Sequence, residues 1–150
     1  MVSIEDLKTN SFFRDFGDEY LSEIVRLCEE ETCQADDFII KEGGAAEKLY
    51  VLLEGTVAIQ IHLKEHQDVI VSTMEERGEL FGWSALVEPR CYTASVKCLE
   101  NSRVLSVRGE ALEMLFRNDP VMGLAFMKKI ASLIDSRLYT TRSRLISCIS

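Results

Sequence analysis

The sequence has few of the residues that mark an exported, membrane-embedded or metal-binding protein. Its 150 residues include 2 prolines, 2 histidines and 1 tryptophan, and its apolar runs are far shorter than a membrane span. The first ten residues carry Glu5, Asp6 and Lys8 and lack the apolar stretch of a secretory signal. We therefore expect a cytoplasmic protein that does not associate with a membrane.

Cysteine and histidine patterns give no metal site. The five cysteines form no CxxC pair, and they are Cys28, Cys33, Cys91, Cys98 and Cys148. An odd number of unpaired cysteines without a signal peptide is typical of reduced thiols, and a four-thiolate iron–sulfur cluster needs closer ligands. His62 and His66 have no convergent carboxylates or cysteines, so we expect both at the surface and predict no metal.

Catalytic motifs are also missing. The chain has no GxSxG elbow, no phosphate-binding Walker loop and no HExxH pair. Its acidic runs at 29–31, 36–37 and 75–76 are adjacent in sequence, which is typical of solvated turns and helix faces rather than of catalytic pairs. We predict that the chain is not an enzyme.

Charge is distributed unevenly along the chain. The net charge is −8, and from Pro120 onward five basic residues accompany one acidic residue, which gives that segment +4 and the preceding part −12. The acidic part of the chain before Pro120 repels the phosphate backbones of nucleic acids, and the sequence has no base-reading motif. We therefore expect no direct nucleic-acid binding.

Apolar periodicity divides the chain into three zones. The first, from Ile4 to Glu31, has helical spacing, and the second, from Thr32 to Arg108, has short segments of period two separated by glycine-containing turns. Short strands at such spacing indicate an antiparallel roll or barrel. The third zone, from Gly109, is helical again. We treat residues 1–118 as a β-roll with N-terminal helices and residues 119–150 as a C-terminal helix of the same domain.

Six strands are predicted in the middle zone. They cover residues 38–40, 49–54, 57–63, 68–74, 93–98 and 103–107. In the third of these, Val57, Ile59, Ile61 and Leu63 alternate with polar or small residues, which predicts one buried face.

The last helix carries a regular apolar seam. Asp119 can cap it and Pro120 can occupy its first position. Steps of three and four residues connect the seam positions Leu124, Met127, Ala131, Ile134, Leu138, Thr141 and Leu145. This spacing is typical of a coiled coil, and we predict a parallel homodimer through it, although a helix packed on its own β-roll has the same pattern over short lengths.

The segment from Gly78 to Val96 carries the functional signal. Two glycines flank Phe81, and the small residues that follow can begin a helical turn whose free N–H groups face a recess. Such a turn inside a β-roll is suited to holding an anion.

Several motifs in order resemble one known family. They are KLYVLLEGTVAI from Lys48, GELFG from Gly78, SAL from Ser84, TASVKC from Thr93 and NDP from Asn118. Together they resemble the cyclic-nucleotide-binding domain of the catabolite activator and fumarate–nitrate regulator family. The resemblance implies a mainly β fold with flanking helices, a double-stranded β-helix (jelly roll) of eight strands, a phosphate-binding cassette and a long C-terminal dimerisation helix.

Two cassette positions depart from that family. Members that bind cyclic AMP or cyclic GMP have a glutamate for the ribose hydroxyl where this chain has Trp83, and an arginine for the cyclic phosphate where it has Tyr92. Each lost charge-assisted hydrogen bond costs roughly 1.5–3 kcal/mol, so together the changes predict at least about a hundredfold weaker binding.

Several readings of the cassette stay open. Trp83 and Tyr92 either line an aromatic pocket or fill it, and Arg90 either reaches an anion or faces solvent. Thr141 either contacts a nucleobase across the dimer, as in some relatives, or fixes helix register. The candidate ligand-binding residues are Phe81, Gly82, Trp83, Ser84, Ala85, Arg90, Tyr92, Thr93 and Thr141.

These observations predict a regulatory small-molecule sensor, the effector-binding part of a transcription regulator. Its ligand would be a cyclic nucleotide or another small anionic or aromatic molecule. The alternative is a ligand-independent dimerisation module whose pocket is filled.

Overall fold

The computed structural model describes residues 3–65 and 67–149, and only the backbone of residue 11. The predicted surface position of His66 lies outside the described residues. The described residues form two compact units, one up to Met114 and one from Leu115 onward, and each is treated by itself. Within the described ranges, every helix is too short or too polar to cross a membrane.

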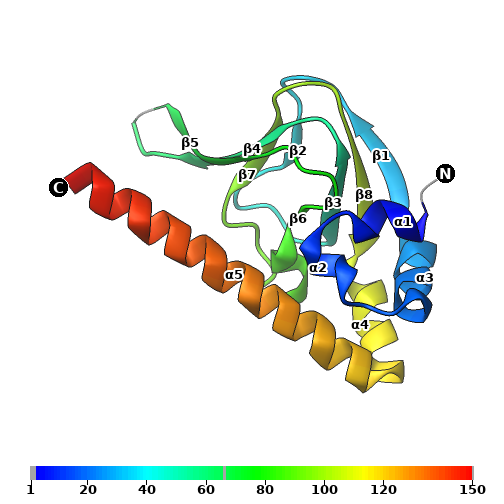
Figure 1. The fold of residues 1–150 in the computed structure, drawn as a ribbon. Helices are drawn as coiled ribbons and strands as arrows, with labels where there is room; N and C mark the ends of the chain where they lie inside the picture. The colour runs from blue at the N-terminus through cyan, green and yellow to red at the C-terminus, as the bar shows by residue number, and fades with distance from the viewer. Residues whose placement is uncertain (1–2, 66, 150) are drawn as a thin grey trace. The chain divides into compact units, whose positions relative to one another are not determined.

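The first unit holds the N-terminal helices and all the described strands (Figure 1). In chain order its elements are α1 (Ile4–Lys8), α2 (Ser11–Arg14), α3 (Asp18–Leu27), β1 (Glu29–Cys33), β2 (Phe38–Ile40), β3 (Lys48–Glu54), β4 (Val57–His62), β5 (Asp68–Met74), β6 (Leu80–Phe81), the 3-10 turn η1 (Trp83–Leu86), β7 (Ser95–Cys98), β8 (Ser102–Arg108) and the first residues of α4 (Gly109–Asn118).

Two four-stranded antiparallel sheets make the β-roll. Their strand orders are β1-β8-β3-β6 and β2-β7-β4-β5. Each sheet takes strands from both ends of the β zone, which is the exchange of a double-stranded β-helix, so the predicted jelly roll is confirmed. Its core cluster consists of Ile40, Tyr50, Leu52, Val57, Met74, Phe81, Val96, Cys98 and Val104.

Strand β4 differs from the simple alternation that its sequence predicts. Val57 and Ala58 are both fully buried, Gln60 is 7% exposed, and Leu63 is 44% exposed. The pairing of β4 with β5 shifts register between Ile59 and Gln60. The unpaired residue is Val71 on β5, so β4 itself is not bulged. The strand ends at His62, and Leu63 lies beyond it and is exposed, so its predicted burial is wrong.

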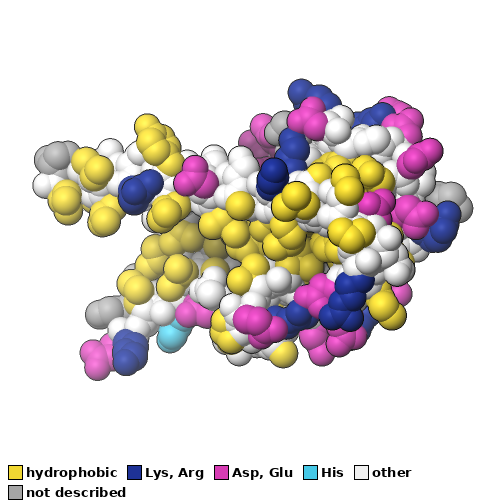
Figure 2. All heavy atoms as spheres, turned by 90° about the horizontal axis from the view of Figure 1, so that it is seen from below, with side chains coloured by type: hydrophobic (Ala, Val, Ile, Leu, Met, Phe, Trp, Pro, Cys, Tyr) yellow, Lys and Arg dark blue, Asp and Glu magenta, His cyan; other side chains and the backbone are white. Residues whose placement is uncertain are grey.

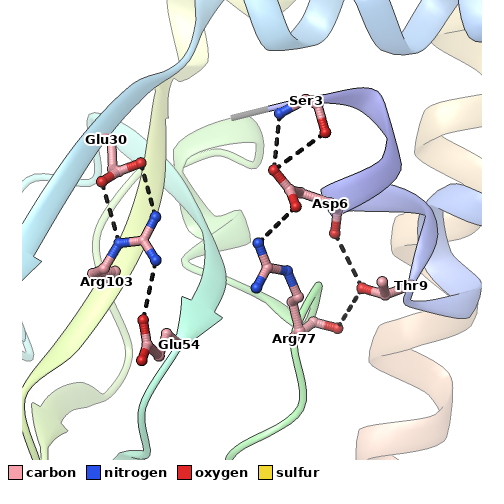
Figure 3. Close-up of polar contacts among 7 residues, drawn as sticks. All are labelled: Ser3, Asp6, Thr9, Glu30, Glu54, Arg77 and Arg103. Atoms are coloured by element: carbon pink, nitrogen blue, oxygen red, sulfur yellow. Dashed lines mark hydrogen bonds and ion pairs between the residues drawn. The ribbon is translucent and has the colours of Figure 1, made fainter. Parts of the chain in front are cut away.

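Strand β1 was expected to be helix. Its three glutamates resemble a solvated helix face, but the chain is extended here and pairs with β8. Arg103 on β8 donates to both carboxylate oxygens of Glu30, at 3.2 and 3.1 Å, and to Glu54 on β3 at 3.0 Å (Figure 3). Lys48 pairs with Glu31 at 3.1 Å. These cross-strand partners stabilise the acidic run as a strand, although its local propensity favours a helix.

The N-terminal helices are tied to the turn between β5 and β6, which leads into the cassette. In α1, Ser3 and Asp6 form a capping box, and Asp6 accepts a hydrogen bond from Arg77 at 2.6 Å (Figure 3). The Thr9 hydroxyl donates to the Arg77 carbonyl at 3.2 Å. Gly78 follows with φ +92°, and a Cβ there would lie 2.5 Å from Cβ of Asn10, so this close approach requires glycine.

The second unit is the end of α4 and the long helix α5 (Pro120–Ile149). The Asp119 carboxylate accepts from the backbone N–H of Met122 at 3.2 Å. Pro120 is the first helical residue, where its missing N–H has no cost. The predicted start of this helix is confirmed.

Candidate ligand-binding cassette

The cassette begins where β6 pairs with β3. Phe81 pairs with Tyr50 and their rings are stacked 5.4 Å apart. The backbone N–H of Gly78 donates to Leu52 at 2.7 Å, and that of Leu52 donates to Glu79 at 2.8 Å. These bonds fix the approach to η1 from a central strand of the sheet.

Gly82 turns the chain from β6 into η1. Its φ is +81°, in the left-handed region that side-chain-bearing residues rarely adopt. A Cβ there would also lie 3.2 Å from each of Ile40 Cδ1, the Lys48 carbonyl oxygen and Tyr50 Cδ2. Both the conformation and the space therefore favour glycine at this position.

The far end of η1 packs against the start of α4. Ala85 is fully buried, and a Cβ on Gly109 would lie 2.4 Å from the Ala85 carbonyl oxygen. The cassette thus contacts the first turn of α4 at backbone distance, which only glycine permits.

Tyr92 is locked into the wall of the β-roll. Its hydroxyl donates to the Lys48 carbonyl at 2.6 Å and accepts from the Lys48 N–H at 3.3 Å. Its backbone exchanges bonds with the preceding loop, donating to Gly44 at 3.0 Å and accepting from Gly43 at 2.8 Å. Burial raises the pKa of Tyr92, and the bond to Lys48 offsets part of that rise. The ring is therefore held in its neutral form at this site.

A small cavity lies beside the Tyr92 ring. Its volume is about 250 Å³, below the roughly 300–1,000 Å³ of typical small-molecule pockets. Apart from Tyr92, the lining residues come from β2, β3 and the loop between them. They are Ile39, Ile40, Lys41, Gly44, Ala45, Glu47, Lys48, Tyr50 and Tyr92.

Arg90 is engaged by carboxylates. Its guanidinium pairs with Glu88 at 3.1 Å and with Glu113 on α4. A longer contact of 3.5 Å reaches the Ala85 carbonyl. The hydrogen bonds to Glu88 and Glu113 raise the pKa of Arg90, so the charge is permanent and is balanced within the protein.

The structure brings together part of the predicted site. Gly82 and Tyr92 face the same wall formed by Tyr50 and Lys48. Trp83 and Ser84 are partly exposed, and Thr93 is exposed. Thr141 belongs to the second unit, where its hydroxyl donates to the Arg137 carbonyl at 2.9 Å.

Sequence reasoning missed three residues that shape this region. Tyr50 and Lys48 form the wall against Tyr92, and Glu113 pairs with Arg90. Tyr50 and Lys48 lie inside the KLYVLLEGTVAI motif. The motif indicated the family, but it did not indicate that these two residues contact Tyr92. Glu113 carries no local signal, because its partner is 23 residues away.

Across residues 3–65 and 67–149, His, Cys, Asp and Glu form no group of three or more arranged to hold a metal ion. The five cysteines are free thiols.

The eight-stranded roll, its cassette turn and its flanking helices match the architecture of a regulatory ligand-binding domain. The family model for the cyclic nucleotide-binding domain matches residues 30–119, which is more than half of the chain. The chain belongs to the cyclic nucleotide-binding domain family, and the predicted resemblance is confirmed.

Individual relatives agree with this assignment. The chain is 30% identical to a putative cyclic nucleotide-binding protein from Geobacter metallireducens GS-15, with a TM-score of 0.78, covering 92% of this chain and 99% of that one. It shares its fold with the N-terminal domain of a transcriptional regulator from Streptomyces coelicolor A3(2), at 24% identity, a TM-score of 0.73 and coverage of 93% and 94%.

The curated relatives include enzymes of which the matched region is a small part. The human cGMP-dependent protein kinase 2 is 27% identical over 96 residues, which are 63% of this chain and 12% of the kinase. The chain thus spans about an eighth of that kinase. The match shows that the two proteins share this domain, and it says nothing of kinase activity in this chain.

Proposed function

We propose that this chain is a regulatory sensor domain that has exchanged the usual cyclic-phosphate contact for an aromatic, neutral wall. One observation carries the proposal: Tyr92, which the family resemblance aligns with the phosphate-binding arginine, commits its hydroxyl to the backbone of Lys48. A neutral ring in a fixed position stabilises no phosphate charge. The preferred ligand is therefore flatter or less dependent on a cyclic phosphate than cyclic AMP or cyclic GMP.

The output is proposed to be transcriptional. Fold likeness to the Streptomyces regulator domain and to the Thermus thermophilus catabolite activator protein supports this choice. A ligand acts in such a protein only if it binds one state of the domain more tightly than another. A change in the cassette can reach α4, because Ala85 contacts the first turn of that helix at Gly109.

The proposal includes a homodimer through α5. The predicted seam residues Leu124, Leu138 and Leu145 are 60%, 51% and 60% exposed. Figure 2 shows hydrophobic side chains gathered along the C-terminal half of α5. Apolar side chains repeated at heptad spacing on an exposed helix support pairing with a second copy.

Ligand specificity can be tested by reversing the two substitutions. The double variant Trp83→Glu with Tyr92→Arg is expected to bind cyclic AMP with measurable heat by calorimetry, whereas the unaltered chain binds at least about a hundredfold more weakly. The control, Trp83→Glu with Tyr92→Gln, has the same loss of the ring without the positive charge and should not gain affinity. If the arginine-bearing variant is folded and gives no heat, then the assignment of Trp83 and Tyr92 to the glutamate and arginine positions is wrong.

A filled, ligand-independent dimerisation domain is the second candidate. The small cavity beside Tyr92 favours it, as does the internal pairing of Arg90. Thermal unfolding with cyclic mononucleotides, cyclic dinucleotides and aromatic anions separates the two candidates. A ligand at a hundred times its dissociation constant adds about 2.7 kcal/mol of stability. A flat response across the panel supports the second candidate.

A further inference from the structure

Two cysteines from different sheets lie side by side where their strands end. Cys33 is the last residue of β1 and Cys98 is the last residue of β7. Their thiols interact directly, and Cys33 packs against the core cluster to which Cys98 belongs. The sequence gives no sign of this proximity, because the two residues lie far apart along the chain.

The turn between β1 and β2 holds the two strand ends together. The Asp37 carbonyl accepts a hydrogen bond from the Cys98 N–H at 2.9 Å, and the same oxygen lies 3.8 Å from the Cys33 sulfur. The Asp36 N–H donates to the Cys98 carbonyl at 2.7 Å. Backbone contacts therefore keep the two cysteines close, in addition to the packing of their side chains.

The two sulfurs differ in their access to solvent. Cys98 is fully buried, whereas Cys33 is partly exposed and lines a cavity of about 470 Å³ together with Asp36, Asp37 and Phe38. Burial raises the pKa of Cys98 to about 12, and the adjacent Cys33 thiol adds to that rise. Cys98 is therefore an uncharged thiol at neutral pH, and an oxidant that enters from solvent meets Cys33 first.

We propose that Cys33 and Cys98 form an oxidation site at which hydrogen peroxide converts the two thiols into a disulfide between the sheets. The Cys33 sulfur attacks one peroxide oxygen, the O–O bond breaks, and a sulfenic acid and one water molecule result. The Cys98 sulfur then displaces the hydroxyl group from the Cys33 sulfur, and the Cys98 proton leaves with it as a second water molecule. Two thiols are thus oxidised by two electrons, and one peroxide is reduced to two waters.

The fold can accommodate this bond. The thiols already interact, and the exposed turn of residues 34–37 can shift so that the strand ends reach disulfide geometry. The bond closes a long loop, so it stabilises the fold mainly by restricting the unfolded chain. It would also restrain β2, whose Ile39 lines both this cavity and the cavity beside Tyr92. The inference does not depend on the proposed sensor function.

Peptide mapping after treatment with hydrogen peroxide tests the pairing. Cleavage after glutamate, lysine and arginine places Cys33 on residues 32–41, Cys91 on 91–97 and Cys98 on 98–100, and it separates Cys28 from Cys33. Free thiols are first blocked with N-ethylmaleimide in denaturant. Mass spectrometry without reduction should then find residues 32–41 linked to residues 98–100, and dithiothreitol should release the two peptides.

Thermal unfolding measures the effect of the bond. The oxidised chain should unfold about 5–10 °C above the reduced chain, the shift expected for a disulfide that closes a loop of this length. Cys33→Ser should show no rise on oxidation. Cys91→Ser is the matched control, because Cys91 is also partly buried, and it should keep both the bond and the rise.

The order of the two steps gives a separate measurement. In Cys98→Ala the reaction should stop at the sulfenic acid of Cys33, which dimedone captures. In Cys33→Ser, dimedone should label Cys98 at least about tenfold less, because that sulfur is buried and protonated. If Cys98→Ala does not fold, Cys33→Ser and the control carry the test.

Three results would overturn the proposal. In the first, Cys33 and Cys98 are both recovered as free thiols although exposed Cys148 has been oxidised, which shows that the oxidant was active. In the second, Cys33 is linked to another cysteine. In the third, the Cys33–Cys98 bond forms but the chain unfolds at the same temperature or lower. None of these results bears on the sensor function.

Discussion

Removing the hydroxyl of Tyr92 tests the structural basis of the proposed function. In Tyr92→Phe the ring remains but the two bonds with the Lys48 backbone, of 2.6 and 3.3 Å, are lost. A carbonyl left without its partner in a half-buried site costs about 1–3 kcal/mol, and we expect about 1.5 kcal/mol here because the ring is only partly buried. At this chain length that corresponds to a fall in Tm of about 3–6 °C.

Thermal and urea unfolding should both detect the change. Tyr139→Phe is the matched control, because Tyr139 is 68% exposed on α5 and its hydroxyl can bond to water. A second signature appears at high pH. Burial raises the pKa of Tyr92 in the folded state, so its contribution to stability is complete below about pH 10 and is lost as the pH rises through the raised value. The phenylalanine variant should lose less stability on that alkaline side.

The reasoning is refuted if Tyr92→Phe unfolds at the same temperature as Tyr139→Phe. In that case the hydroxyl contributes nothing to the wall of the cavity. Tyr92 would then be free to move when a ligand enters, and the loss of the phosphate contact would need another explanation.

Three further predictions concern other parts of the molecule. Leu138→Asp should abolish the dimer, since a charge in an apolar seam is poorly solvated; a monomeric unaltered chain in sedimentation would remove the basis for the seam. Asp6 has its pKa lowered by the Ser3 backbone bond and the Arg77 charge, which outweigh desolvation, so stability should fall as pH drops below about 4. Asp6→Asn should flatten that decline by less than about 1 kcal/mol in thermal unfolding, and an unchanged slope would contradict the assignment. Iodoacetamide at pH 8 should label exposed Cys148 much faster than Cys28, whose pKa burial raises to about 12, and similar rates by mass spectrometry would disprove this.

Much of the fold could be predicted because its signals are local. Glycines with positive φ at positions 55, 78 and 82 mark the corners, and β-branched runs mark the strands between them. Asp119 and Pro120 similarly mark the start of α5. Each of these signals depends on only a few neighbouring residues, so it can be recognised in the sequence without knowing the rest of the fold.

The errors came from interactions across the sheets. The acidic run of β1 looks helical until Arg103 and Lys48 supply its partners from other strands. Leu63 is exposed because the pairing of β4 with β5 ends at His62 and Asp68, and where a pairing ends is set by both strands. Neither effect can be recognised from the sequence of the affected strand alone.

The residues alone predict an antiparallel roll or barrel and a cassette from Gly78, because glycine conformations and strand periodicity are properties of the chain. The family resemblance then implied the jelly roll and the two departures at Trp83 and Tyr92. The contacts of Tyr92 and Arg90 depend on the folded structure. Their partners, Lys48 and Glu113, lie 44 and 23 residues away. Such contacts form only when the roll has closed, and they decide whether a side chain faces a ligand or the protein itself.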